Sequence, residues 1–259
     1  MALSERQIQA IVEAVSTAEP LRPLERPRER RPCRVLESHL EGPRYRALRL
    51  EIPPSYREAH ERPAQYVTLK TTHSEPRFFV IANAPGEPHW DFLIERISEF
   101  GPLFDALECE HSLLVSPPEG TGFDLGAALG KTVHLFATGS GIATMRPLIQ
   151  HWLANPDLAP RQTNLYYGES APEDFAYTDE LEAWRDEGIL VYQALGHGPT
   201  QAFPYQFVQH AFEARSSSIG SSSNDEALVY ISGAPIMMEV IADKMLRLGL
   251  PPQRLITNL

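Results

Sequence analysis

The chain of 259 residues is long enough for two ordinary domains, and its hydrophobic fraction of 42% and charged fraction of 22% are typical of a soluble globular protein. No apolar run approaches the ~20 residues that span a bilayer, and the charged start lacks the apolar core of a signal peptide. Two cysteines cannot ligate an iron–sulfur cluster, which takes four thiolates, or build a disulfide framework. We therefore expect a cytoplasmic protein with no membrane span.

The net charge of −11 is unevenly distributed. Residues 1–60 are slightly basic, whereas the rest of the chain carries 12 Lys and Arg against 25 Asp and Glu. An acidic body repels phosphate, so no nucleic-acid partner is expected. The arginine-rich segment 26–34 is interrupted by Pro27 and Pro32, which favours a solvated arm over a docking patch for an acidic partner or a membrane.

The first half of the chain predicts a helix followed by short strands. Residues 4–17 have the apolar spacing of an amphipathic helix that Ser4 can cap, and the Pro- and Arg-rich residues 19–32 predict an extended linker. Six apolar segments broken by Pro, Gly and polar residues indicate a small antiparallel barrel or sandwich, with one short helix at 99–108. These predicted strands are 34–40, 45–52, 65–70, 77–83, 90–97 and 111–116.

After Gly130 strands and helices alternate, which indicates a parallel sheet with crossover helices. The boundary between the halves falls near 126–131. The Ser-rich residues 215–226 predict a flexible surface loop. The predicted strands are 132–138, 163–168, 189–195 and 227–232, and the predicted helices are 144–153, 172–186, 205–214 and 236–249.

Three loops of the second half could bind a nucleotide. A strand runs into Gly139-Ser140-Gly141, where backbone N–H groups and a helix start can hold a diphosphate, although a turn without ligand is also consistent with this pattern. Tyr167-Gly168 and Ser232–Pro235 follow two further strands. Ligands of open α/β sheets lie at the carboxyl ends of the strands, so three such loops on one edge favour a nucleotide site.

Other residues offer weaker signals. Arg77 stands two residues before the aromatic Phe79, so one strand face could pair with a phosphate and a flat ring, but a core strand with a surface arginine fits equally. The nine histidines lack metal-ligand spacing, and we expect no metal. His134 is interpreted as a core residue, and both cysteines as unreactive. The acidic residues along 173–187 read as a solvated helix face.

Taken in order, these loops resemble the ferredoxin–NADP reductase-like family of flavin- and pyridine-nucleotide-dependent oxidoreductases. The resemblance covers roughly residues 34–259 and is closest to the small "fruit protein" branch of that family. The segments that carry it are RFFVIAN (77–83), SPPEGTGFDL (116–125), HLFATGSGIATMRPLI (134–149), YYGESAPEDFAYTDELEAW (166–184) and YISGAPIMMEV (230–240).

The resemblance implies a six-stranded antiparallel Greek-key barrel that binds FAD, followed by a Rossmann-like five-stranded parallel α/β domain that binds NAD(P)H. The implied domains are an N-terminal arm at 1–33, the barrel at 34–128 and the nucleotide domain at 129–259. The cofactor-binding residues it implies are Arg77, Phe79, Val80, Ile81, Gly122, Gly139, Ser140, Gly141, Ile142, Tyr167, Gly168, Ser232, Gly233, Pro235 and Met237.

The chain departs from the family pattern at four of these positions or their neighbours. Phe79 replaces a tyrosine and Val80 a serine, so two hydroxyl groups near the flavin are lost. Ser232 replaces a cysteine. Glu169 stands near the place where phosphate-selective members present arginine, which favours NADH over NADPH as the reductant.

These features predict a flavoprotein oxidoreductase that passes hydride from NAD(P)H through FAD to an unidentified acceptor, which could be a protein. No side chain is expected to act as a catalytic acid or base. The alternative is a non-enzymatic or regulatory relative that binds nucleotide, or a partner through residues 1–33, and has a degraded flavin site. An unrelated two-domain protein with a generic nucleotide fold ranks third.

Overall fold

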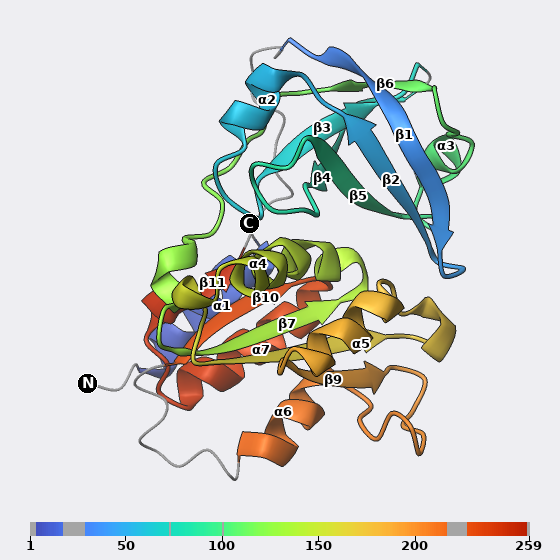
Figure 1. Cartoon of the computed structure of the whole chain (residues 1–259). Helices are drawn as coiled ribbons and strands as arrows, with labels where there is room; N and C mark the ends of the chain where they lie inside the picture. Colours follow the sequence, from blue (N-terminus) through green and yellow to red (C-terminus); the bar gives the residue numbers. More distant parts are fainter. Residues whose placement is uncertain (1–3, 18–28, 73, 100, 217–226, 258–259) are drawn as a thin grey trace. The chain divides into compact units, whose positions relative to one another are not determined.

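The computed structural model describes residues 4–17, 29–72, 74–99, 101–216 and 227–257. The chain forms two compact units (Figure 1). The sheet unit consists of helix α1 (Glu5–Thr17), Gly126–Ile142 and the chain from Asn155 onward. The barrel unit consists of Leu21–Leu125 and of Ala143–Ala154, which is nearly all of helix α4 (Ile142–Ala154). The domain boundaries expected at residues 33 and 128 stay predictions.

Six antiparallel strands form the barrel unit, in the order β4-β3-β6-β1-β2-β5. Just after β4, the N–H of Ala82 donates to the carbonyl of Asp91 on β5 (2.8 Å), which joins the two ends of this order. The predicted strands and the antiparallel Greek-key barrel are thus confirmed. The strands are β1 (Arg31–Glu41), β2 (Tyr45–Glu51), β3 (Tyr66–Lys70), β4 (Arg77–Val80), β5 (His89–Glu95) and β6 (Ser112–Val115).

Apolar side chains that alternate along these strands fill the barrel. Two short helices add to its core. α3 (Gly101–Asp105) lies inside the predicted segment 99–108, whereas α2 (Pro54–Ala59) was not predicted. Tyr56 of α2 stacks on the buried ring of Trp90 with ring centroids 6.0 Å apart, so α2 closes part of the core.

Five parallel strands form the sheet unit, in the order β11-β10-β7-β8-β9, which confirms the predicted Rossmann-like fold. The strands are β7 (Thr132–Thr138), β8 (Gln162–Glu169), β9 (Leu190–Leu195), β10 (Ala227–Ser232) and β11 (Leu255–Thr257). β11 was not predicted, because three residues are too few for a periodic signal. Helices α5 (Thr178–Asp186), α6 (Val208–Ser216) and α7 (Pro235–Arg247) belong to the same unit.

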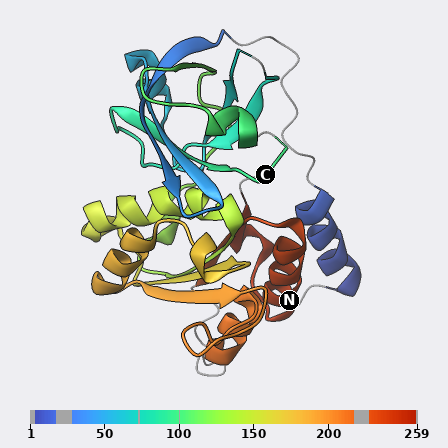
Figure 2. The same ribbon diagram turned by 90° about the vertical axis from the view of Figure 1, so that its right-hand side faces the viewer.

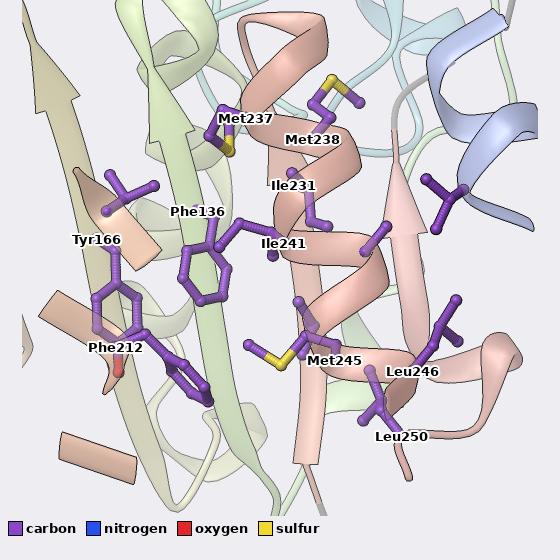
Figure 3. Packing of buried hydrophobic residues seen from close by; sticks show 14 of the residues in the cluster. Phe136, Tyr166, Phe212, Ile231, Met237, Met238, Ile241, Met245, Leu246 and Leu250 are labelled. Atoms are coloured by element: carbon purple, nitrogen blue, oxygen red, sulfur yellow. The ribbon is translucent and has the colours of Figure 1, made fainter. Parts of the chain in front are cut away.

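One face of the parallel sheet is covered by aromatic and aliphatic side chains from the strands and from α6 and α7 (Figure 3). Phe136 stacks on Tyr166 with ring centroids 4.6 Å apart, and Phe212 of α6 lies edge-on to both. His134 is buried in the same layer, with Nδ1 3.4 Å from the Tyr166 hydroxyl, and burial lowers its pKa to about 4. His134 is therefore a core residue, as predicted.

Helix α1 lies alongside α7 (Figure 2), as its predicted amphipathic pattern requires. Its side chains Ile8 and Val12 are buried in the core of the sheet unit. At the start of the helix the side-chain oxygen of Gln7 accepts from both the N–H (2.9 Å) and the hydroxyl (2.8 Å) of Ser4, so the Ser4 hydroxyl donates to Gln7 instead of accepting from the helix as expected. At its start, Glu5 pairs with Arg247 of α7 (2.7 Å). The apolar face of α1 is thus used within the chain.

The structure corrects three local predictions. The helix predicted at 172–186 begins only at Thr178, because Tyr177 adopts a left-handed conformation (φ 58°) and Phe175 stacks on Phe203. The helix predicted at 205–214 begins at Val208. The linker predicted at 19–32 lies outside the described residues up to position 28, and Arg31 already belongs to β1.

The described end of the arginine-rich segment pairs with barrel groups. Arg30 Nε donates to the Thr68 hydroxyl (3.0 Å), and Arg34 pairs with Glu51 and Glu110, both at 3.0 Å. This part therefore lies on the barrel surface, where Arg34 pairs while it stays exposed to solvent. Most of the predicted Ser-rich loop, 217–226, lies outside the described residues. Among the helices that are described, none is long and apolar enough to cross a bilayer.

Candidate functional site

The ends of β10, β7 and β8 lie next to one another at one edge of the parallel sheet. Ser232 pairs with Ala137, and Thr138 pairs with Gly168. The three loops singled out in the sequence therefore start from three adjacent strands, as expected for loops that act together. Parallel pairing also brings their carboxyl ends to the same level.

The first loop turns directly from β7 into a helix. Thr138 is extended, Gly139–Gly141 form a single 3₁₀ turn, and α4 begins at Ile142. The first N–H groups of a helix lack partners within it and can therefore bind an anion such as a diphosphate. Gly139 and Ser140 are half-buried, whereas Gly141 and Ile142 are buried.

The first loop packs directly against the loop that follows β10. A Cβ atom on Gly141 would overlap the carbonyl oxygen of Ser232, and a Cβ on Gly233 would overlap the hydroxyl oxygen of Thr138. The Thr138 hydroxyl accepts a hydrogen bond from the N–H of Ala234 (2.9 Å). Glycine at 141 and 233 thus lets the two loops touch, and Thr138 joins them.

Sequence reasoning did not identify Thr138 or Ala234 as a linked pair. They lie 96 positions apart, so the only local signal was that each adjoins a glycine of the motif. Both residues belong to the candidate site because they set the distance between its two glycine loops.

The end of β8 contains a buried polar pair. Tyr167 donates its hydroxyl to the Glu169 carboxylate (2.8 Å) and accepts from the N–H of Ala176 (3.2 Å). Both side chains are buried, and the ring of Tyr167 lies edge-on to Phe175. The Tyr167 side chain is therefore held within its own unit, and the contact of Tyr167 and Gly168 with a nucleotide stays a prediction.

The start of α7 is exposed at Pro235 and Ile236, while Met237 and Met238 are buried. Pro235 is the first residue of the helix, a position that needs no N–H donor. The side chain of Met237 points into the core cluster of the sheet unit (Figure 3). Among the predicted residues of this loop, Gly233 and Pro235 are thus the accessible ones.

In the barrel unit, the predicted flavin residues lie on β4. Phe79 is opposite Val67 and Arg77 is opposite Leu69. Opposed residues of an antiparallel pair share a face, and Val67 and Leu69 are fully buried. Phe79 accordingly packs edge-on against Phe104 of the barrel core, with centroids 5.1 Å apart. Both Arg77 and Phe79 stay half-buried.

The other face of β4 carries Phe78 and Val80. Phe78 lies edge-on to Tyr66, with centroids 5.5 Å apart, and Val80 is opposite Tyr66. The next residue, Ile81, is a fully buried core residue whose N–H donates to Gln65 (3.0 Å). Gly122 packs so closely on Arg62 and Pro63 that a Cβ atom would overlap them.

No group of three or more His, Cys, Asp and Glu side chains could hold a metal ion within the described parts of the chain. Cys33 is buried, and this burial raises the pKa of its thiol to about 12, so the thiol stays protonated. Cys109 is exposed and directs its sulfur at the carbonyl of Leu36 (3.3 Å).

Comparison with known proteins gives the class of the second half of the chain. Residues 135–243 match the family model described as an oxidoreductase NAD-binding domain. The matched segment contains all three loops at the sheet edge. No curated protein matches the chain.

Most of the chain has the fold of solved flavoprotein reductases. Amycolatopsis cytochrome P450 reductase GcoB is 20% identical, with a TM-score of 0.74 over 90% of this chain and 70% of that one. A ferredoxin NADP+ reductase from Neisseria gonorrhoeae, solved with FAD and NADP, is 17% identical, with a TM-score of 0.72 over 88% and 98%. The CS-b5R domains of human Ncb5or, in the NAD+ form, are 19% identical, with a TM-score of 0.73 over 91% and 71%.

These findings confirm the resemblance drawn from the sequence. The chain is similar in fold to ferredoxin–NADP reductase-like reductases, and its segment 135–243 matches an oxidoreductase NAD-binding domain.

Proposed function

We propose that this protein is a cytoplasmic flavoprotein oxidoreductase that takes hydride from NAD(P)H and delivers the electrons, through FAD, to an acceptor not yet identified. The observation that supports it most is the meeting of the three loops at one sheet edge, inside the segment that matches an oxidoreductase NAD-binding domain. The barrel fold, which is shared with a reductase solved with FAD and NADP, supports the flavin.

The residues at the sheet edge fit a dinucleotide. N–H groups at Gly139–Gly141 would bind its diphosphate, since the N–H of Ile142 already donates within the turn, and the Thr138 hydroxyl, by holding Ala234, would keep the second glycine loop in place. The exposed Pro235 and the adjoining Gly233 would border the nicotinamide end. Preorganised donors of this kind bind without the cost of ordering a loop.

The barrel residues fit a flavin in part. Arg77 would pair with its diphosphate, and the half-buried Phe79, despite its contact with Phe104, would offer an apolar surface beside the ring. Neither Phe79 nor Val80 can donate a hydrogen bond, so flavin binding is expected to be weaker than with tyrosine and serine there. FAD, when bound, would supply the ring that accepts the hydride, and the chain would supply placement.

We further propose NADH as the preferred reductant. The Glu169 carboxylate lies at the end of β8 and is buried beside the Tyr167 hydroxyl, where solvent screens its charge poorly. A 2′-phosphate brought to this strand end would be repelled.

The test is a visible absorption spectrum of the purified protein with added FAD, followed by anaerobic addition of NADH and, separately, NADPH. A bound-flavin spectrum that is bleached faster by NADH supports the proposal. A protein that binds neither FAD nor either nucleotide contradicts it. Binding of nucleotide without FAD would instead support the regulatory alternative. A partner that binds through residues 1–33 could not use the apolar face of α1, because that face is already packed against α7.

A further inference from the structure

A buried arginine in the barrel unit has partners that its sequence position does not suggest. Arg146 lies in α4, four residues after Ile142, in a helix of otherwise mostly apolar residues. Its side chain is only 10% exposed. A charged group at such a site is costly to bury unless it is paired and hydrogen-bonded, so its contacts should reveal what the residue is for.

The guanidinium of Arg146 uses several of its donors. Nη1 donates to the carbonyl of Ala82 (2.9 Å) and to the Asp91 carboxylate (3.1 Å). With the amide of Gln150 oriented so that its oxygen faces Arg146, that oxygen accepts from Nε (3.3 Å) and Nη2 (3.1 Å). This forked arrangement suits arginine, because lysine offers a single point charge.

The contacted backbone is the segment that closes the barrel. The N–H of Ala82 donates to the carbonyl of Asp91, while the side-chain amide of Asn83 donates to the carbonyl of His89 (2.8 Å) and accepts from the N–H of Asp91 (2.9 Å). Ala82 comes two residues after Val80, so this segment continues the strand that carries the predicted flavin residues.

Asp91 is the anion that balances Arg146. Its carboxylate, 13% exposed, also accepts from Arg49 Nε (2.8 Å) and Nη2 (3.2 Å). Burial acts to raise the pKa of Asp91, but the two arginines lower it by a larger amount, so the pKa lies below its usual value. Arg49 and Arg146 therefore share the Asp91 carboxylate, but only Arg146 also donates to the carbonyl of Ala82.

We propose that Arg146 is a positioning residue for the flavin strand: by holding the carbonyl of Ala82 and the side chain of Asp91, it fixes the backbone that follows Val80 and Ile81. The inference rests on the proposed function only in taking FAD as the ligand of this strand.

The experiment compares Arg146→Met with the matched control Arg49→Met, which removes the other arginine from Asp91. The first readout is hydrogen exchange of a peptide covering residues 78–84, without any cofactor. We expect exchange there to rise at least tenfold in R146M and less than threefold in R49M. The second readout is FAD affinity, expected to fall about tenfold in R146M and to be restored only in part in R146K, because lysine keeps the charge beside Asp91 but not the forked set of donors.

Equal exchange and equal FAD affinity in R146M and R49M would overturn the proposal. Wild-type protein that binds no FAD would overturn the proposed function instead, and the exchange comparison would still decide whether Arg146 orders the segment.

Discussion

The two units place their candidate sites in different ways. In the sheet unit, the site is made of backbone at three adjacent strand ends, joined by the Thr138–Ala234 hydrogen bond. In the barrel unit, the site depends on side chains of one strand, and Phe79 among them also packs against the core. A backbone site depends on where glycines stand, whereas a side-chain site depends on which face of a strand each residue occupies. The first can be inferred from a motif more securely than the second.

The largest expected effect tests the backbone site. Gly141→Val would force a side chain into the carbonyl of Ser232, so we expect nucleotide affinity to fall by about 100-fold or more while FAD still binds. Isothermal titration with NADH measures the loss, and FAD binding reports that the barrel is folded. Gly196→Ala is the control, because its Cβ would make only ordinary contacts (3.6 Å). Similar affinities for the two variants would contradict the close approach of the loops.

The second prediction concerns the loss of stability at low pH, which depends on one buried histidine in each unit: His134 in the sheet unit and His60 in the barrel unit. Burial lowers the pKa of both to about 4 from 6.5. The folded protein therefore binds fewer protons than the unfolded chain, and stability is complete above about pH 6.5 and is lost as the pH falls towards 4. Each group contributes a loss of up to about 3 kcal/mol. Urea unfolding at pH 7 and pH 5 should show a smaller loss in His134→Gln and in His60→Gln; an unchanged pH slope would refute the assignment.

The third prediction concerns the two phenylalanines of β4. Phe79→Leu should reduce the free energy of unfolding by about 1.5 kcal/mol, because its ring packs on the buried Phe104. Phe78→Leu should cost less, since its aromatic partner Tyr66 is itself half-buried. Urea unfolding without cofactor measures both. A larger loss for F78L would mean that the faces of the strand are reversed.

The smallest expected effect comes from the link between the loops. Thr138→Val keeps the shape of the side chain but removes the acceptor for the N–H of Ala234. A lost hydrogen bond of this kind costs about 1 kcal/mol, which corresponds to about fivefold weaker NADH binding. Thr132→Val, which removes a hydroxyl that accepts from Arg161 at the exposed start of β7, is the control and should bind NADH as the wild type does. Wild-type NADH affinity in T138V would show that the two glycine loops keep their positions without the Thr138–Ala234 hydrogen bond.

Much of the fold was predictable because its signals are local. Alternation along the barrel strands and the 3.6-residue spacing of α1 can be read from a few neighbouring residues. α2 and β11 were missed because they are short. The helix predicted from residue 172 was cut short by tertiary packing, since Phe175 turns onto Phe203 instead of continuing a helical face.

The candidate site, like the fold, was predictable only where its signals are local. The glycine loops were found from their sequence, and their common edge followed from strand order. The partners of these loops were not found: Ala234 bonds a residue 96 positions away, and Arg146 bonds Ala82 and Asp91, which are 64 and 55 positions away. Such pairs exist only once the chain has folded, so no local pattern encodes them.

The packing of α1 against α7 has a consequence for how the protein is made. Glu5 and its partner Arg247 are 242 positions apart, so α1 leaves the ribosome long before the helix against which it packs. The strands of the barrel emerge early and can close during translation, whereas the sheet unit is completed only at the end. Until α7 has been made, Ile8 and Val12 lack the helix that covers them, so α1 exposes these apolar side chains during synthesis.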